Sequence, residues 1–195
     1  MVHAQSAASS RRRAWLLALA AALALLRAPS AAWGAVPEYD VKAALIYKIS
    51  KFVHWPESAF ANSNGTLRLC ILGRDDFGTS IDALKGQKVQ GQSMQVERLP
   101  KPDPTLGGCH IVFVSRSEAE RLPAVVGALG GAPALTISDL DGFAAQGGMI
   151  GFATRDGKLS FQINPAASAR SGLEIGAQLL QLATLVEERR KEAKP

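Results

Sequence analysis

One short stretch of the chain, residues 109–115 (CHIVFVS), constrains the fold more than any other. It follows a pair of glycines and is a run of β-branched and aromatic residues, which is typical of a strand buried on both faces. Such strands lie in the middle of sheets that helices cover on both sides. A second run of this kind, residues 67–72, contains Cys70, the only cysteine besides Cys109. We therefore expect these two runs to be neighbouring strands at the centre of one sheet.

The rest of the chain predicts strands that alternate with helices. Two apolar runs near the C-terminus are joined by Asp156-Gly157, and an Asp-Gly pair in this position is a strong hairpin signal. Pro123 either kinks or restarts the helix in which it lies. We expect helices at 38–53, 79–84, 118–129 and from 165 to about 192, and strands at 66–72, within 87–99 as one or two strands, and at 109–114, 134–138, 149–153 and 158–164. This order predicts an α/β fold, a single domain with a mostly parallel central sheet flanked by helices, a C-terminal β-hairpin and a long C-terminal helix.

The first 35 residues have the pattern of a signal peptide. Three arginines at 11–13 precede an apolar stretch at 14–26, and four small residues between 31 and 35 offer a cleavage site. The apolar stretch is shorter than the roughly 20 residues that a membrane-spanning helix needs. We therefore expect residues 1–35 to be a cleaved signal peptide and residues 36–195 to form the domain, with an uncleaved N-terminal anchor as the alternative.

Removal of the signal peptide changes the charge of the protein. Four basic residues and no acidic residue lie within 1–35, so the net charge falls from +5 to +1 (22 − 4 = 18 bases against 17 acids). The remaining chain has no basic stripe with interleaved aromatic residues. We therefore expect no nucleic-acid partner.

The two cysteines, Cys70 and Cys109, allow two states. In the oxidising compartment that an exported protein reaches, a disulfide forms and persists. Closing a loop of about 40 residues would stabilise the fold by about 4 kcal/mol in the chain-entropy model. Two separately buried thiols are the alternative, because free cysteine is among the most buried residue types. Export favours the disulfide.

No arrangement of residues predicts catalysis or a metal site. Cys109 and His110 are adjacent, but neighbouring residues of a strand point to opposite faces, so the imidazole cannot readily reach the sulfur. His110 is better explained as a packed core histidine. Beyond residues 1–35 the only histidines are His54 and His110, and they show no metal-ligand spacing with the cysteines. We therefore expect no catalytic, cofactor-binding or metal-binding residues and no enzymatic activity.

Two loops have the outline of a ligand site but lack its essential residues. Residues 138–142 (SDLDG) lack the further oxygen ligands and the closing glutamate of a calcium loop, so we expect a turn capped by aspartate side chains. Residues 73–78 lie between a strand and a helix, where an anion binds readily. However, this loop lacks the glycine and lysine pattern of a phosphate site, and Asp75 and Asp76 would repel phosphate.

Two predicted helices have surfaces suited to association. The C-terminal helix is apolar over more than one face, so part of it is free to meet another chain. The first helix combines interface-type aromatic residues (Tyr39, Tyr47, Phe52 and Trp55) with a polar side (Lys42, Lys48 and Lys51). The alternative is that both helices simply dock on the sheet.

An ordered set of short motifs resembles a known family. The motifs are KFVHWP (51–56), LCILG (69–73), GCHIVF (108–113), LTISD (135–139), GF (142–143), GGMI (147–150) and FQIN (161–164). In this order they resemble the YfiR family of periplasmic proteins, and the resemblance covers about residues 38–186. Cys70 and Cys109 match a cysteine pair of that family. A second pair that some relatives carry is absent here, so a redox role that rests on it is not implied.

The resemblance implies a periplasmic regulator without enzymatic activity. Relatives in the family bind the periplasmic part of an inner-membrane diguanylate cyclase and hold it inactive. An OmpA-like outer-membrane lipoprotein withdraws them, so that envelope or redox stress raises cyclic di-GMP and promotes biofilm formation. We expect the same role here, with a homodimer as the acting form and the partner-binding residues unassigned.

A function of a different class stays open beside this one. A periplasmic small-ligand-binding protein would use the loops at the carboxyl ends of the strands, after Gly73, Ser115 and Ser138. A thiol oxidoreductase is a weaker alternative, because the chain has no Cys-x-x-Cys motif and both sulfurs lie in apolar strands.

Overall fold

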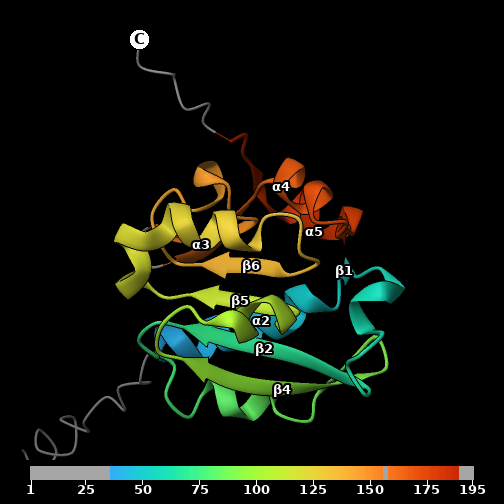
Figure 1. The fold of residues 1–195 in the computed structure, drawn as a ribbon. Coiled ribbons are helices and arrows are strands. Elements are labelled where there is room, and N and C mark those ends of the chain that lie inside the picture. Colours follow the sequence, from blue (N-terminus) through green and yellow to red (C-terminus); the bar gives the residue numbers. More distant parts are fainter. Residues whose placement is uncertain (1–35, 156–157, 189–195) are drawn as a thin grey trace, which may run out of the picture. The chain divides into compact units, whose positions relative to one another are not determined.

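The structure, a computed structural model, describes residues 36–155 and 158–188 (Figure 1). From Pro37 on, the chain forms one compact unit, which agrees with the predicted single domain. The predicted signal peptide, residues 1–35, lies outside the described residues.

The domain is built on a mixed sheet in which most neighbouring strands run parallel (Figure 1). In sheet order its strands are β10 (Thr184–Leu185), β8 (Lys158–Ile163), β7 (Ile150–Arg155), β6 (Leu135–Ser138), β5 (Ile111–Val114), β2 (Thr66–Leu72), β4 (Gln92–Leu99) and β3 (Lys88–Val89). The pairs β3–β4 and β7–β8 are antiparallel, and the pairs between the other neighbours are parallel. This arrangement confirms the predicted α/β class, the mostly parallel sheet and the C-terminal hairpin.

The two apolar runs are neighbouring strands at the centre of the sheet, as predicted. Leu69 of β2 pairs with Ile111 of β5, and all four residues of β5 are buried. A strand with neighbours on both sides and helices over both faces has no side toward water, which explains its unbroken apolar sequence. His110 lies just before β5 and not within it, but its backbone still bonds both neighbouring strands, through Arg68 O at 2.9 Å and Leu135 N at 2.8 Å.

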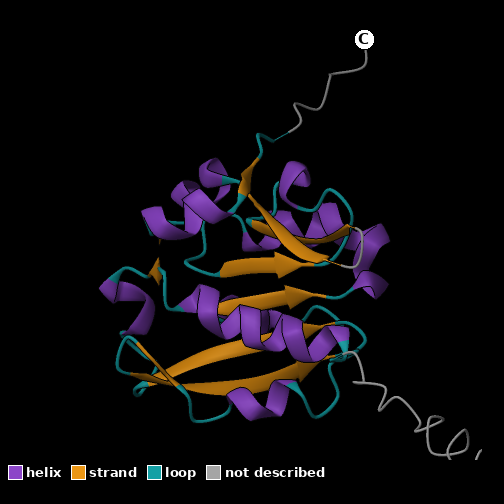
Figure 2. Ribbon diagram, turned by 180° about the vertical axis from the view of Figure 1, so that it is seen from behind, coloured by secondary structure: helices purple, strands orange, loops and turns teal. Residues whose placement is uncertain are grey.

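Helices cover both faces of this sheet (Figures 1 and 2). On one face lies α2 (Glu38–Ser50), the long helix in front of the sheet in Figure 2, which packs through Ala43, Ile46 and Ile49. These residues share a hydrophobic cluster with Leu69 and Ile71 of β2. Their spacing of three residues places them on one side of the helix, whereas Val41, which the apolar pattern of the sequence assigns to the buried side, is 40% exposed.

The opposite face carries α3 (Leu122–Leu129), whose Leu122, Val125 and Leu129 are buried. They share a second cluster with Cys70 and Leu72, and alternate residues of a strand point to opposite faces. A 3₁₀ helix, η4 (Arg116–Arg121), precedes α3, so Pro123 lies in the first turn of a new helix. The proline therefore restarts the helix and does not kink it.

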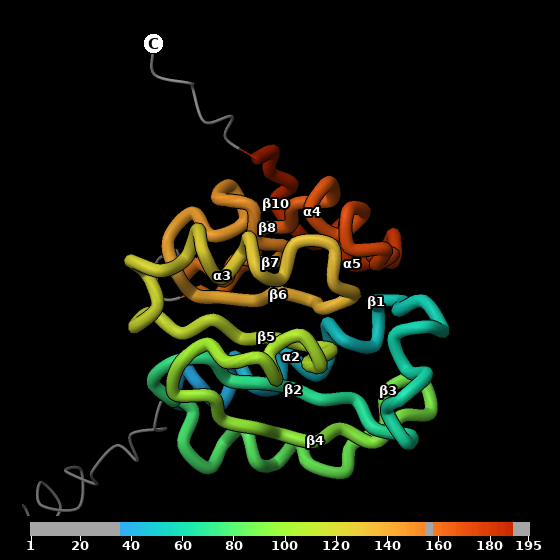
Figure 3. The backbone as a smooth tube through the Cα atoms, viewed as in Figure 1, coloured from blue at the N-terminus to red at the C-terminus, as the bar shows by residue number. Residues whose placement is uncertain are grey.

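The prediction of one long C-terminal helix is wrong. The structure has two short helices, α4 (Pro165–Arg170) and α5 (Ala177–Leu182), separated by β9 (Glu174–Ile175) and followed by β10 (Figure 3). Gly172 has φ +67°, a conformation that ends a helix and favours glycine. The segment then pairs β9 with β1 (Val53–His54), and Gly176 donates a hydrogen bond of 2.7 Å to the carbonyl oxygen of Phe52. This antiparallel pairing interrupts the helix.

Three smaller differences concern the ends of elements. The first helix ends at Ser50 and not at Val53, because Val53 and His54 form β1. The predicted helix at 79–84 is reduced to a 3₁₀ helix, η2 (Ile81–Leu84). Residues 87–99 form two strands, β3 and β4, one of the two outcomes that the sequence allowed.

Candidate functional site

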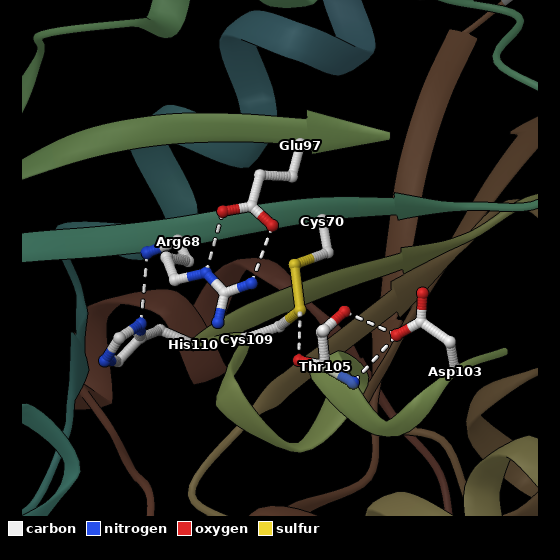
Figure 4. Close-up of a disulfide and its surroundings, with 7 residues drawn as sticks. All are labelled: Arg68, Cys70, Glu97, Asp103, Thr105, Cys109 and His110. Carbon is white, nitrogen blue, oxygen red and sulfur yellow. Dashed lines mark hydrogen bonds and ion pairs between the residues drawn. A yellow bond between two sulfur atoms is a disulfide. The ribbon is translucent and has the colours of Figure 1, made fainter. Parts of the chain in front are cut away.

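A disulfide links the two predicted site residues, Cys70 and Cys109 (Figure 4). Their sulfurs are 1.95 Å apart, their Cα atoms are 6.0 Å apart, and both residues are buried. Cys70 lies in β2, and Cys109 directly follows the 3₁₀ helix η3 (Pro104–Gly108). The bond therefore ties η3 to the centre of the sheet.

The start of η3 is held by a side-chain cap. Asp103 accepts a hydrogen bond of 2.7 Å from the backbone N–H of Thr105 and a second one from the Thr105 hydroxyl (Figure 4). These two bonds hold the pKa of Asp103 below its usual range. The loop that carries Cys109 is thus fixed at both ends, by the cap and by the disulfide.

His110 is a packed histidine, as predicted. Its Nδ1 accepts a hydrogen bond of 3.0 Å from the backbone N–H of Arg68, so the proton of the neutral ring lies on Nε2, 3.0 Å from the carbonyl oxygen of Ala59. The ring stacks on Phe60 at a centroid distance of 4.8 Å. Burial lowers the pKa of His110. Figure 4 shows the imidazole pointing away from the sulfurs, so Cys109 and His110 form no nucleophile–base pair.

An ion pair lies beside the disulfide. Arg68 donates two hydrogen bonds to the carboxylate of Glu97, at 2.8 Å and 2.6 Å (Figure 4). These bonds hold the pKa of Glu97 below its usual range. A Cβ atom on Gly108 would lie 2.5 Å from Nη1 of Arg68, so only glycine fits at this position without a shift of the guanidinium. The pair joins β2 to β4 next to the loop that the disulfide holds.

A second cluster gathers at the carboxyl ends of β5 and β6, where the small-ligand alternative places its loops. Asp139, the residue after β6, is buried, and its Oδ2 lies 2.6 Å from Lys42 Nζ of α2 and 2.9 Å from the hydroxyl of Tyr39. Arg116, the residue after Ser115, approaches the same oxygen to 3.4 Å. Parallel neighbours end at the same edge of a sheet, which is why these residues meet.

The cluster is a buried ion pair with one open acceptor. Lys42 is 1% exposed and is also 2.7 Å from Glu38 of the same helix, so its charge is balanced by two carboxylates. Burial, followed by the hydrogen bond to Asp139, raises the pKa of Tyr39. The other carboxylate oxygen of Asp139, Oδ1, has no hydrogen-bond partner among the described residues. It is an acceptor that an ordered water or a ligand donor would satisfy.

This cluster corrects two expectations. Lys42 was expected on the polar side of the first helix, whereas it is buried against the sheet. In the 138–142 turn the aspartates were expected to cap the backbone, but the cap comes from Ser138, whose Oγ accepts a hydrogen bond of 3.0 Å from Leu140 N. Asp139 instead points to α2. A lysine at helical spacing with apolar residues gives no local sign of burial, because its partner lies 97 residues away.

A comparison with known protein families shows to which family the chain belongs. A family model described as YfiR/HmsC-like matches residues 39–184. The matched range begins in α2 and ends in β10, so it includes the central strands, the disulfide and the Lys42–Asp139 cluster. The chain belongs to the YfiR/HmsC-like family. This membership confirms the resemblance that the ordered motifs indicate, and the family is regulatory rather than catalytic.

Residues 36–155 and 158–188 contain no group of three or more histidine, cysteine, aspartate or glutamate residues placed to hold a metal ion. Within the same residues no helix is long and apolar enough to cross a membrane.

Proposed function

We propose that this YfiR/HmsC-like protein is a periplasmic regulator that binds the periplasmic part of an inner-membrane diguanylate cyclase and represses it, thereby lowering cyclic di-GMP and biofilm formation. The observation that carries the proposal is the family match over residues 39–184. The signal-peptide pattern of residues 1–35 supports export. The disulfide supports it too, because such bonds persist in an oxidising compartment.

Exposed apolar side chains offer a surface for the partner or for a second copy of the chain. Val41 of α2 and Phe52 are 40% and 38% exposed, and Leu182 and Leu185 are 76% and 54% exposed. The β1–β9 pairing places Phe52 beside the start of α5, the helix that carries Leu182, so the surface is centred on Phe52 and Leu182. We place the contact with the cyclase on this surface, so the contact between the copies of the proposed homodimer lies elsewhere. In the same proposal, an OmpA-like outer-membrane lipoprotein withdraws the regulator from the cyclase.

Site-specific crosslinking in intact cells tests this assignment. A photo-crosslinking amino acid at Leu182 is compared with the same group at Glu120, an exposed residue of η4. We expect the probe at Leu182 to capture an inner-membrane protein with a cytoplasmic diguanylate cyclase domain, and the probe at Glu120 to capture much less of it. A deletion strain should show raised cyclic di-GMP. Unchanged cyclic di-GMP together with no captured cyclase would contradict the proposal.

A second candidate function, small-ligand binding, is favoured by a pocket at the carboxyl ends of the strands. Its volume is about 410 Å³, and Arg116, Asp139 and Asp141 contribute to its lining. Native mass spectrometry of the purified protein tests this function. A copurifying small molecule that is lost in Arg116→Ala would support it, whereas a ligand-free wild-type protein would count against it.

A further inference from the structure

Another pocket lies where the C-terminal end of α3 approaches α4, away from the disulfide and from the Lys42–Asp139 cluster. Its volume is about 420 Å³, within the roughly 300–1,000 Å³ that is usual for small-molecule sites. Val126, Leu129 and Met149 supply apolar lining, and Arg170 supplies a positive charge. An apolar wall with one cation fits a small molecule that has an apolar body and one anionic group.

A carboxylate of the chain already lies on that cation. Glu188 Oε2 is 2.7 Å from Nη2 of Arg170, although the two residues are 18 positions apart. A Cβ atom on Gly147, another lining residue, would lie 3.2 Å from Glu188 Oε1. The carboxylate of Glu188 therefore contacts Arg170 and lies close to Gly147, two parts of the pocket wall. It shows where a carboxylate is accommodated beside the apolar lining.

The Arg170–Glu188 contact is open to exchange. The side chains are 54% and 43% exposed, and ion pairs exposed to this degree contribute little to stability. Arg170 presents a planar fork of donors that matches a carboxylate equally well from the chain or from a ligand. A ligand carboxylate with an attached apolar group would gain the burial of that group, which Glu188 cannot provide.

We propose that this pocket binds a small amphipathic carboxylate, whose carboxylate replaces that of Glu188 on Arg170 and whose apolar part lies against Val126, Leu129 and Met149. Glu188 then acts as an internal competitor that keeps the site closed at low ligand concentration. The inference does not depend on the cyclase partner, since it rests on the pocket and the ion pair alone.

Calorimetric titration of the mature protein with decanoate tests the proposal, with decanol as the uncharged reference of equal chain length. We expect wild type to bind decanoate and Glu188→Gln to bind it about threefold more tightly, because a weak competitor is removed. Arg170→Gln should weaken decanoate binding about tenfold through the loss of a charge-assisted contact. In the Arg170→Gln background, Glu188→Gln should have no further effect. Affinity for decanol should be the same in all variants.

Glu187→Gln is the matched control, because Glu187 is an exposed neighbour of Glu188 with the same charge. It should leave decanoate affinity unchanged. All variants alter half-exposed or exposed side chains, and urea unfolding will verify that they fold. Absence of decanoate binding in both wild type and Glu188→Gln would overturn the proposal. Equal affinities in wild type and Arg170→Gln would overturn it as well, and would leave Glu188 as a structural tie for the C-terminal segment.

Discussion

Lys42 lies on the buried side of α2, and its side chain is 1% exposed. A buried charge is tolerated only when it is paired and hydrogen-bonded. Asp139 and Glu38 provide that pairing at 2.6 Å and 2.7 Å. Such pairs contribute little net stability compared with apolar packing, but losing one partner is costly. The pair therefore links α2 to the residue that directly follows β6.

We expect Lys42→Met to lower the free energy of unfolding by about 3 kcal/mol, because it leaves the carboxylate of Asp139 buried without its main partner. Urea unfolding measures the change. The double variant Lys42→Met/Asp139→Asn should recover part of the loss, since it removes the unpaired charge. Lys48→Met is the matched control, because Lys48 lies exposed on the same helix and should change stability by no more than about 0.5 kcal/mol. Equal effects of Lys42→Met and Lys48→Met would contradict the role of the ion pair.

His110 makes the stability of the fold depend on pH. Burial lowers its pKa below the ordinary value of 6.5 in the folded state, so below pH 6.5 the unfolded chain binds a proton that the folded chain does not. The contribution of His110 to the free energy of unfolding is complete above pH 6.5, and it is lost as the pH falls toward the pKa that His110 has in the folded state. We therefore expect the free energy of unfolding of wild type to fall between pH 7.5 and about pH 5.

His110→Asn keeps an acceptor for Arg68 N but removes the titrating ring. The variant should be less stable at pH 7.5, because the stacking on Phe60 is lost, yet its stability should change less between pH 7.5 and 5.5. Urea midpoints at the two pH values give the comparison. The lowered pKa values of Glu97 and Asp103 affect stability only at lower pH. Parallel pH profiles for wild type and variant would show that another group causes the dependence.

At the scale of elements, the disulfide joins a surface 3₁₀ helix to a central strand. The cysteines are 39 residues apart, and the segment between them contains β3, β4 and η3. Cross-linking over such a distance restricts the unfolded chain, which is the main source of stabilisation in the chain-entropy model.

Cys70→Ala/Cys109→Ala should therefore lower the free energy of unfolding by about 4 kcal/mol. Alanine is preferred to serine, because both positions are buried and a hydroxyl there would need a partner. Equilibrium unfolding in urea measures the loss, and limited proteolysis should show faster cleavage near residues 104–108. Wild type in reducing buffer should behave like the double variant. A loss of less than 1 kcal/mol would mean that the loop between the cysteines is restricted even without the bond.

The C-terminal elements show where periodicity misleads. The spacing of apolar residues over 165–192 does not distinguish one long helix from several short elements that pack on the same core. Leu173 and Leu179 both belong to the hydrophobic cluster that includes residues of α2, although Leu173 lies in the loop before β9 and Leu179 lies in α5. Gly172 and Gly176 are the local sign of a break within this pattern, since glycine is unfavourable inside a helix.

At the scale of the whole molecule, export decides the environment in which the sheet and its disulfide function. We expect the protein from the periplasmic fraction to begin at about residue 36, and intact mass spectrometry will show this directly. A Leu19→Arg variant, with a charge in the apolar stretch of the signal, should keep the mass of the whole chain and fail to reach the periplasm. A wild-type protein that keeps residues 1–35 would favour the N-terminal anchor instead.

The sequence predicts those parts of the fold in which burial constrains several consecutive residues. The run at 111–114 is apolar throughout, and that at 67–72 is apolar except for Arg68, because both faces of β2 and β5 are largely covered; this property is visible without knowledge of any contact. The alternation of strands with helices then indicates the mostly parallel sheet, and Asp156-Gly157 the hairpin.

Long-range partners are different, because they depend on which segments the strand order brings together. Lys42 meets Asp139 across 97 residues, and Arg170 meets Glu188 only because β10 returns to the edge of the sheet beside β8. Neither pair leaves a pattern in the local sequence, since each member alone looks like an ordinary surface charge. The apolar runs thus define the core, whereas the charged contacts and the pockets arise from packing between segments that are distant in the chain.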